Sequence, residues 1–527
     1  MDGVRATKRP SLLIRAADLL DRFAAPLYLL ALASFAVLFA LAARFFTLEA
    51  DEAWILLSTA YTFGVPVGNG TPLPSPTVTT GGIHLLLHGL LDGVTMDVLA
   101  HRAVSLLATG VLLVFVYRLL RTGGAAAAVA VAGTAFFAST PGFIFQASLA
   151  TGEVLATLLL LLATYHWTRR GRHAAGAAVL TGVLLGLACA TRINCLVAAP
   201  AIVTHTLLWQ GLDRRTLFRS LLAAGLCLAL AGFAVEAYKL AGQAAIGRHQ
   251  AEYLALSTGV GARKPVGKIL EYVGIVNQFV PAAVIATLVG AWLVRWQAGG
   301  GRERRPVLET AGLAILIGLA MCAAWVLFSP IPHLRYLWPA LACLWFAGSL
   351  LLVDWWRDLG GSPARLAVHL AVATTCGYAL LASALAVAQG ESLTLVYQAS
   401  GESPRLSLPG SERFRAAADQ QALATFVGGR PLDARFIAYR PPVSFPVGYL
   451  AHRRIDSVAS IAPRGEQYLL LAPADYAVWR LDPRFDVWRR DHATLAFRRG
   501  GFAAFRIGDG APVPPGESNP LGRNDYF

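Results

Sequence analysis

Apolar runs of about twenty residues recur through the first three quarters of the chain, and each is long enough to cross a hydrocarbon core of about 30 Å as a helix. Only 14% of the residues are charged and mean hydropathy is +0.55, whereas a soluble chain normally carries about a quarter charged residues. The sequence therefore predicts an α-helical polytopic membrane protein with about eleven transmembrane helices. The runs lie near residues 25–46, 98–118, 124–142, 150–167, 174–191, 195–210, 220–238, 277–296, 309–328, 335–353 and 366–389.

The positive charge falls in alternate loops, which argues against a nucleic-acid partner despite the net charge of +14. Because cytoplasmic loops of membrane proteins are enriched in Lys and Arg, the N-terminus is predicted inside and the C-terminus outside. We predict a multi-pass protein of a bacterial inner membrane, with its first run retained as an anchor. The basic groups are Arg5/Lys8/Arg9/Arg15/Arg22, Arg118/Arg121, Arg169/Arg170/Arg172, Arg214/Arg215/Arg219, Arg295/Arg302/Arg304/Arg305 and Arg357/Arg365.

Composition also divides the chain into domains. Residues 1–389 form a predicted transmembrane domain with a first outer loop at 47–97, where Glu49–Phe63 is typical of an interfacial helix. Charge returns after residue 390, which indicates a small periplasmic α/β domain over 390–510 and a loose tail over 511–527. Within that domain we expect helices at 411–427 and 475–481 and strands at 434–439, 467–472, 493–497 and 502–507.

All six cysteines lie in or beside apolar runs and none lies in the tail. That distribution supports neither a disulfide framework nor a zinc site, so we interpret the cysteines as packing residues.

Ionisable side chains gather at the predicted outer ends of the spans. A charge at the centre of a span would cost roughly 2.5–3.5 kcal/mol. A cavity that holds carboxylates and arginines beside lipid suits a substrate with a phosphate head, a sugar and a long apolar tail. The group comprises Asp51, Glu52, His84, Arg102, Glu153, Arg192, Glu236, Lys239, His333, Arg335 and Tyr336.

Several short motifs resemble GT-C membrane glycosyltransferases, and in particular the group of the lipid A aminoarabinose transferase and the protein O-mannosyltransferases (glycosyltransferase family 39-like). Asp51-Glu52 follows the first span, and His333-Leu334-Arg335-Tyr336-Leu337-Trp338-Pro339 opens a late one. The order of the motifs extends the resemblance over nearly the whole chain. The other motifs that resemble this group are Arg102–Leu120, Gly152-Glu153-Val154, Gly186-Leu187-Ala188 before Thr191-Arg192, Ser444–Leu450 and Gln467–Leu471.

The resemblance implies inverting transfer of one sugar from a polyprenyl-phosphate-linked donor to lipid A or lipopolysaccharide, another envelope glycan, or protein. Such a reaction needs a base for the acceptor's proton and cations for the departing phosphate. Asp51 matches the family's first-loop acid and is the expected catalytic base, and Glu52 is expected to orient it or to bind the acceptor. The expected phosphate ligands are Arg335 and Arg192, assisted by Tyr336, His333 and Lys239, and the expected substrate-binding residues are Glu153, His84 and Arg102.

Each of these residues also has a structural interpretation. An acidic pair at a helix start is often only solvated, Glu153 fits an ion pair at the end of its span, and Arg192 stands where relatives often have lysine. His84 and His88 share a helical face, yet most such pairs are structural, so we predict no metal ligand. No cofactor is predicted, and a divalent metal stays open because the fold class includes enzymes with and without one.

Two other functions compete with glycosyl transfer. A transporter or flippase for a lipid-linked sugar would show repeated halves and charges near the midplane, and neither is evident. A non-catalytic envelope scaffold is the third hypothesis, against which the Asp51 and Arg335 motifs count. The expected partners are the bilayer, the polyprenyl-phosphate-sugar and a glycan, lipid or protein acceptor, without nucleic acid.

Overall fold

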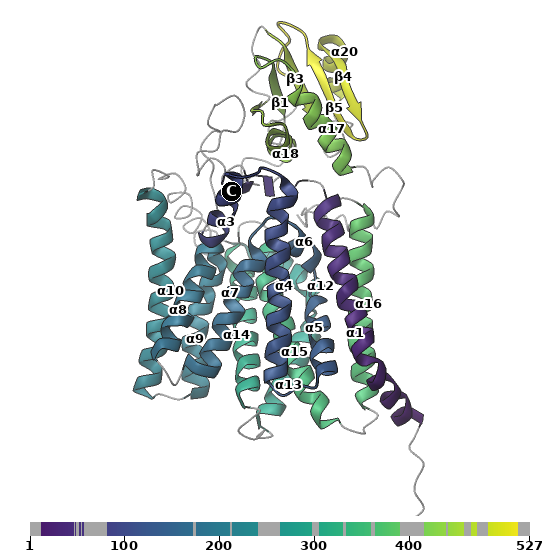
Figure 1. Ribbon diagram of the computed structural model, residues 1–527. Helices are drawn as coiled ribbons and strands as arrows, with labels where there is room; N and C mark the ends of the chain where they lie inside the picture. Colours follow the sequence, from purple (N-terminus) through teal and green to yellow (C-terminus); the bar gives the residue numbers. More distant parts are fainter. Residues whose placement is uncertain are drawn as a thin grey trace, which may run out of the picture.

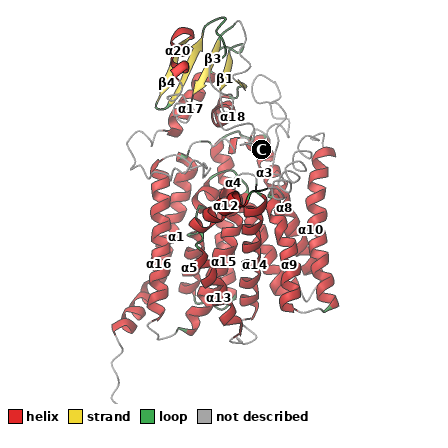
Figure 2. Ribbon diagram, turned by 180° about the vertical axis from the view of Figure 1, so that it is seen from behind, coloured by secondary structure: helices red, strands yellow, loops and turns green. Residues whose placement is uncertain are grey.

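The computed structural model describes residues 12–46, 48, 52–53, 55–56, 59, 82–171, 175–210, 213–240, 264–297, 305–329, 334–359, 364–389, 416–438, 441–457, 465–471 and 483–514. A bundle of long helices makes up the larger part, and a small α/β domain sits on the end of the bundle where α3 lies (Figure 1). The same two-part arrangement is seen from behind, with every strand in the small domain (Figure 2).

Every predicted apolar run overlaps a helix among the described residues. The helices of the bundle are α1 (Leu12–Phe45), α3 (Gly82–Asp92), α4 (Val98–Thr122), α5 (Ala127–Ala138), α6 (Phe143–Ser148), α7 (Glu153–His166), α8 (Ala175–Thr191), α9 (Ala198–His205), α10 (Arg214–Leu240), α12 (Val266–Phe279), α13 (Ala282–Gln297), α14 (Arg305–Phe328), α15 (Leu334–Asp358) and α16 (Ala364–Gln389).

The bundle is that of a multi-pass membrane protein. Among the described residues, 6 helices are long and apolar enough to cross a membrane, or up to 7 if α12 and α13, bent by 67°, form one broken span. Helices α5, α8 and α9 are apolar but shorter than a full crossing, so the count of eleven stays a prediction. Helix α5 ends at Ala138, because Pro141 lacks a backbone N–H and Gly142 has a φ of +74°.

The closest helix packing joins α8 and α10, and glycine makes it possible. A Cβ built on Gly186 would lie 2.6 Å from Leu230 Cβ, and one built on Gly182 would lie 2.8 Å from the Ala223 carbonyl oxygen. Small residues at such contacts let two backbones approach in a bilayer, where no hydrophobic effect drives helices together. The α8 backbone that leads to Arg192 is thereby fixed against α10.

The small domain contains one mixed five-stranded sheet in the order β2-β1-β3-β5-β4. Strand β1 is parallel to β2 and β3, while β5 is antiparallel to β3 and β4. The strands are β1 (Arg435–Ala438), β2 (Ile455–Ser457), β3 (Gln467–Leu471), β4 (Ala493–Arg499) and β5 (Phe502–Ile507), and the helices are α17 (Ala416–Gly428), α18 (Pro441–Ala451) and α20 (Pro483–His492).

Both faces of this sheet are covered, as alternation along the strands requires. Phe436 and Tyr468 pack with Leu423 of α17, whereas Ile437 and Leu469 on the other face pack with Trp488 of α20. The predicted strands are confirmed, and α18 and β2 are additions that the sequence analysis did not place. The predicted helix at 475–481 and residues 515–527 lie outside the described residues. At the start of the predicted tail, the Pro512 carbonyl accepts a hydrogen bond from Trp488 at 2.8 Å.

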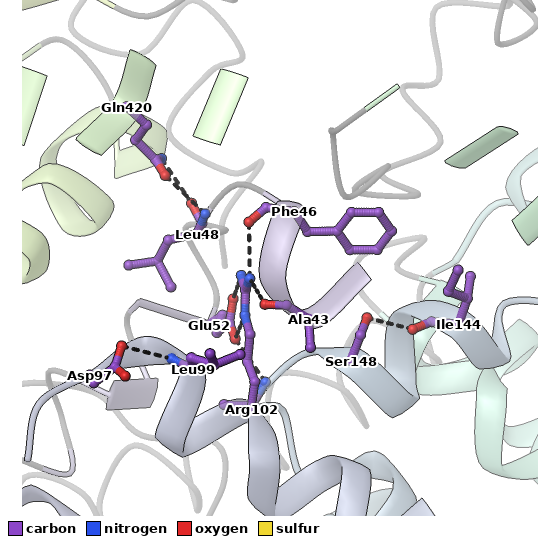
Figure 3. Close-up of polar contacts among 11 residues, drawn as sticks. Ala43, Phe46, Leu48, Glu52, Asp97, Leu99, Arg102, Ile144, Ser148 and Gln420 are labelled. Atoms are coloured by element: carbon purple, nitrogen blue, oxygen red, sulfur yellow. Dashed lines mark hydrogen bonds and ion pairs between the residues drawn. The ribbon is translucent and has the colours of Figure 1, made fainter. Parts of the chain in front are cut away.

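Two polar contacts fasten the small domain to the bundle. Gln420 of α17 accepts from the Leu48 N–H at 2.9 Å and donates to the Leu48 carbonyl at 3.1 Å, as Figure 3 shows. The Tyr449 hydroxyl of α18 donates to the Met96 carbonyl at 3.0 Å. Around these contacts Tyr449 packs with Leu48, Ala53, Leu56 and Ala150.

Replacement of Gly186 by alanine should destabilise the bundle, because the new Cβ meets another Cβ and only a backbone shift relieves the overlap. We expect a loss of about 1–3 kcal/mol, typical of overpacking. Gly225→Ala on α10 is the matched control, since a Cβ there meets nothing within 4 Å. Thermal unfolding in detergent measures both variants, and equal midpoints would contradict the packing argument.

Candidate functional site

A buried ion pair joins the first outer loop to α4. Arg102 donates from Nε to Glu52 Oε1 at 2.8 Å and from Nη2 to Oε2 at 2.6 Å, and both side chains are buried. Arg102 Nη1 also donates to the carbonyls of Ala43 at 2.8 Å and Phe46 at 2.9 Å, at the end of α1 (Figure 3). The fork of Arg102 therefore holds Glu52 and the last turn of α1 together.

The α6–α7 turn, residues 149–152, touches three candidate site residues. The Ala150 N–H donates to Glu52 Oε1 at 2.8 Å, and the Thr151 carbonyl accepts a hydrogen bond from Arg192. Gly152 has a φ of +79°, and a Cβ there would lie 3.0 Å from His84 Cγ. Gly152 thus meets two demands that other residues cannot, a left-handed conformation and contact with an imidazole ring.

A second charged cluster follows the turn and is centred on Tyr336. Glu153, the first residue of α7, pairs with Arg192 at 2.5 Å. The guanidinium carbon of Arg192 lies 6.0 Å from the centroid of the Tyr336 ring, and that of Arg335 lies 4.8 Å from the same centroid. Arg335 also donates to the Tyr336 hydroxyl at 2.8 Å. Two guanidinium groups at one tyrosine ring suit the paired oxygens of an anion.

Asn194 anchors the backbone of Tyr336, the residue on whose ring the two arginines converge. Its amide donates to the Tyr336 carbonyl at 2.7 Å. This hydrogen bond links the segment between α8 and α9 to the start of α15. Because Arg192 lies two residues before Asn194, one short segment supplies a cation to the cluster and positions the tyrosine. Asn194 was not predicted, and its amide alone gives no sequence signal.

A row of buried polar rings leads away from the α6–α7 turn. His84 and His88 of α3 have ring centroids 4.2 Å apart, and His88 Nδ1 lies 2.8 Å from His101 Nδ1 on α4. His101 Nε2 in turn contacts Asp92 Oδ1 at 3.0 Å. We call Asp92, His101, His88 and His84 the histidine row, and all four side chains are buried.

Burial controls protonation along α3. Loss of hydration lowers the pKa of His88 to about 3, with a contribution from His101. Burial also lowers the pKa of His84 well below its usual range, and the charges of His88 and Arg192 lower it further. The pKa of Asp92 is raised, chiefly by burial. His84 and His88 are therefore neutral near pH 7, with one ring nitrogen protonated in each.

A cleft of about 480 Å³ lies between the two domains, above the start of α4. Asp97, Gln421 and His452 give it hydrogen-bonding side chains, and His452 has a positive φ of 51°. Burial raises the pKa of Tyr449 at the cleft, and the nearby carboxylates of Asp92, Glu52 and Asp97 raise it further. Tyr449 also packs with Ala53, the neighbour of Glu52 in the chain, so one wall of the cleft rests on the segment that contains Glu52. Its lining is Met96, Asp97, Val98, Gln421, Tyr449, Leu450 and His452.

The structure brings most of the predicted site residues into these clusters. Glu52 pairs with Arg102, Glu153 pairs with Arg192, and Arg335 and Tyr336 join the latter pair. His84 lies against Gly152. Asp51 and His333 lie outside the described residues, as does the side chain of Lys239, whose backbone lies in the last turn of α10.

The sequence analysis missed His101 and Asp92, although a signal existed. His84, His88 and Asp92 follow one another at intervals of four, so they lie on one face of a helix. The turn after α3 then brings His101 of α4 to that face. Among the described residues no group of three or more His, Cys, Asp or Glu side chains has a metal-holding arrangement.

Comparisons with known proteins agree with this architecture. Residues 90–238 match the family model described as dolichyl-phosphate-mannose-protein mannosyltransferase. The crystal structure of ArnT from Cupriavidus metallidurans bound to undecaprenyl phosphate superposes with a TM-score of 0.55 at 13% identity, covering 91% of this chain and 97% of that one. The apo state of the same protein gives 0.53 at 14% identity, with the same coverage of both chains. No curated protein matches the sequence.

A third solved structure is the archaeal oligosaccharyltransferase AglB from Archaeoglobus fulgidus in complex with an inhibitory peptide and a dolichol-phosphate. It matches at a TM-score of 0.45 and 13% identity, and the match covers 81% of this chain and 64% of that one. The chain has the fold of the GT-C membrane glycosyltransferases, with a small C-terminal sheet domain. The resemblance predicted from the sequence motifs is therefore confirmed.

Loss of either partner of the Glu52–Arg102 pair should strongly destabilise the protein. Glu52→Gln or Arg102→Met removes the ion-pair partner of a buried charge, which typically costs about 3–5 kcal/mol. The double variant should lose less than the sum of the two single losses, because it removes both charges. Denaturant unfolding measures all three, with Arg118→Ala on the exposed face of α4 as control. Additive losses would show that the two groups do not act as a pair.

Proposed function

We propose that the protein is an inverting glycosyltransferase that moves one sugar from a polyprenyl-phosphate-linked donor to an envelope acceptor on the periplasmic face. The convergence of the guanidinium groups of Arg192 and Arg335 on the Tyr336 ring carries the proposal. Two guanidinium groups at one ring suit the oxygens of a phosphate at the end of a lipid. The GT-C fold and the family match support the same chemistry.

Asp51 is the proposed base, and Glu52 acts by positioning it. Both oxygens of Glu52 are held by Arg102, and one also accepts from Ala150, so Glu52 is poorly suited to take a proton itself. Asp51 directly precedes this anchored residue in the chain. Its carboxylate would remove the proton of the acceptor hydroxyl as that oxygen bonds to the anomeric carbon.

The donor phosphate leaves with the electrons of the broken bond between the anomeric carbon and oxygen. Arg335 and Arg192 would hold the charge that develops there, since planar guanidinium groups match phosphate oxygens in pairs. Tyr336 orients both cations through its ring and, for Arg335, through its hydroxyl. Lys239 and His333 remain proposed helpers at the same phosphate.

The acceptor would approach through the cleft between the domains. The carboxylate, amide and imidazole groups of Asp97, Gln421 and His452 suit the hydroxyls of a carbohydrate head. We propose that this face is periplasmic, with the N-terminus in the cytoplasm. Lipid A, another envelope glycan and protein all fit the proposal as acceptors, and no residue on the cleft chooses among them.

A transporter of a lipid-linked sugar is the alternative function. The bend of 67° between α12 and α13 is the one feature among the described residues that favours it, because transporters use interrupted helices. The Glu52–Arg102 and Glu153–Arg192 pairs, which consist of predicted site residues, instead lie at the end of the bundle that faces the small domain. That placement favours an enzyme.

Substitution of the proposed base tests the function directly. A null strain should lose one sugar mass from a single envelope lipid, glycan or protein, and wild type should restore it while Asp51→Asn at equal expression should not. Mass spectrometry of the three fractions provides the measurement. Full restoration by Asp51→Asn would refute the base assignment, and a lipid-linked sugar that accumulates without any missing acceptor mass would favour transport.

Loss of a phosphate ligand should weaken use of the donor. Arg335→Ala removes a charged hydrogen-bonding group, worth about 1.5–3 kcal/mol, so kcat/KM for the donor should fall by about ten- to a hundredfold. Arg335→Lys should recover only part of this, because an ammonium lacks the planar fork. Arg118→Ala is the control for loss of an arginine. Unchanged kcat/KM in Arg335→Ala would remove Arg335 from the donor site.

A further inference from the structure

We propose that three buried polar side chains beside the α6–α7 turn bind the sugar of the donor, and that they select a sugar with hydroxyl or amino groups and without a carboxylate. The three residues are His84, Thr151 and Asn194, and we call them the sugar-binding cluster. The inference rests on the proposed function. It concerns the sugar of the donor, and neither the base nor the phosphate ligands.

Each residue of the sugar-binding cluster has a buried polar atom that lacks a hydrogen-bond partner among the described residues. The atoms are His84 Nε2, Thr151 Oγ1 and Asn194 Oδ1. His84 and Thr151 are almost wholly buried, with exposed fractions of 2% and 3%. A buried polar atom without a partner is costly, because it has lost its hydration and gained nothing in exchange. A ligand that supplies the missing partners would remove this cost.

The contacts of His84 determine which of its nitrogens carries a proton. Burial lowers the pKa of His84 well below its usual range, so the ring is neutral near pH 7. A hydrogen bond to the backbone of Ala150 acts in the opposite sense and raises the pKa, as a bond to a carbonyl oxygen does. Because a carbonyl oxygen can only accept, Nδ1 carries the proton of the neutral ring. His84 Nε2 is therefore left as an acceptor.

The other two atoms of the cluster can also accept a hydrogen bond. Asn194 donates from its amide nitrogen to the Tyr336 carbonyl at 2.7 Å, so the atom left over is Oδ1, which only accepts. The Thr151 hydroxyl can accept or donate. Two acceptors and one hydroxyl match the hydroxyl or amino groups of a sugar. A carboxylate, which has only lone pairs to offer, would face the lone pairs of two of the three atoms.

The cluster adjoins an arginine that is proposed to bind the donor phosphate. Arg192 donates a hydrogen bond to the Thr151 carbonyl, and it lies near enough to His84 for its charge to add to the effect of burial on the pKa of that ring. Asn194 follows Arg192 by two residues and bonds to Tyr336. Because the sugar is bonded directly to the phosphate, it must lie beside the groups that hold that phosphate.

Gly152 allows the imidazole of His84 to lie against the turn that carries Thr151. A Cβ at Gly152 would lie 3.0 Å from His84 Cγ and 3.3 Å from its Nδ1, so a larger residue would push the ring away. Helix α3 and the α6–α7 turn therefore form one side of the proposed subsite, and the segment between α8 and α9 contributes Asn194. Packed elements of this kind hold polar groups in place before a ligand arrives.

Binding of two lipids separates recognition of the sugar from recognition of the phosphate. The ligands are the polyprenyl-phosphate-sugar extracted from the null strain and bare polyprenyl phosphate, each added to purified full-length protein without acceptor. The rise of the thermal unfolding midpoint with ligand concentration gives each affinity. Thr151→Val removes the hydroxyl but leaves the carbonyl that binds Arg192. We expect it to weaken binding of the sugar donor by about five- to tenfold and to leave binding of bare polyprenyl phosphate unchanged.

A second variant and a matched control complete the binding experiment. His84→Phe keeps a flat ring beside Gly152 and removes the acceptor, so it should weaken binding of the sugar donor by about tenfold, with bare polyprenyl phosphate again unaffected. Thr134→Val on α5 is the control, because this buried hydroxyl already has a partner and donates to the Ala130 carbonyl at 2.8 Å. It should bind both lipids as wild type does.

The other outcomes of the binding experiment have different meanings. Equal weakening for both lipids in Thr151→Val and His84→Phe would show a structural role, and unchanged affinities would show that water, and not the sugar, occupies the cluster. Either result would overturn the inference. Wild-type protein that binds both lipids equally well would also overturn it, while the phosphate site would stand. Wild-type protein that binds neither lipid would refute the proposed donor site and the inference together.

The class of the sugar has a measurement of its own. Mass spectrometry of the envelope fractions gives the sugar mass that the acceptor loses in the null strain. We expect the mass of a pentose, a hexose or an amino sugar, since these groups donate to the acceptors of the cluster. The mass of a uronic acid would overturn the inference although the transferase would stand, whereas the loss of no sugar mass at all would refute the proposed function.

Discussion

The pairing of Glu52 with Arg102 is the interaction on which the end of the bundle that faces the small domain depends. Arg102 binds the carboxylate and the last carbonyls of α1, and the Ala150 N–H completes the carboxylate's partners. Because both charges are buried, neither group can exchange its partner for water without a large cost. One ion pair therefore sets where the first outer loop, α4 and the α6–α7 turn lie relative to one another.

The two charged clusters differ in a way that suits different tasks. The Glu52–Arg102 pair is balanced, with one carboxylate and one guanidinium in bidentate contact. The cluster around Tyr336 brings two guanidinium groups to one ring, and Glu153 pairs with one of them. Arg102 donates to Glu52 and to two backbone carbonyls, so its pair positions backbone. The second cluster is the one proposed to hold a phosphate.

The sequence predicted what depends on local pattern and missed what depends on contact across the fold. Each apolar run became a helix, because lipid demands that a span satisfy its own backbone. The same pattern did not show that Glu52 and Arg102, 50 positions apart, would pair, nor that a turn would bring His101 to His88. Helix α18 was missed because Pro446 inside it reads as a helix breaker.

The α6–α7 turn shows why the site must move as one unit if it moves at all. The turn binds Glu52 through Ala150 and Arg192 through Thr151. The bare backbone of Gly152 contacts His84. The next residue, Glu153, pairs with Arg192. A shift that brought the base segment toward a donor phosphate would carry the arginine and the histidine with it. The distance between Glu52, the neighbour of the proposed base in the chain, and Arg192, a proposed phosphate ligand, is therefore set by a few backbone atoms of this turn. Such preorganisation is what group transfer between two bound substrates requires.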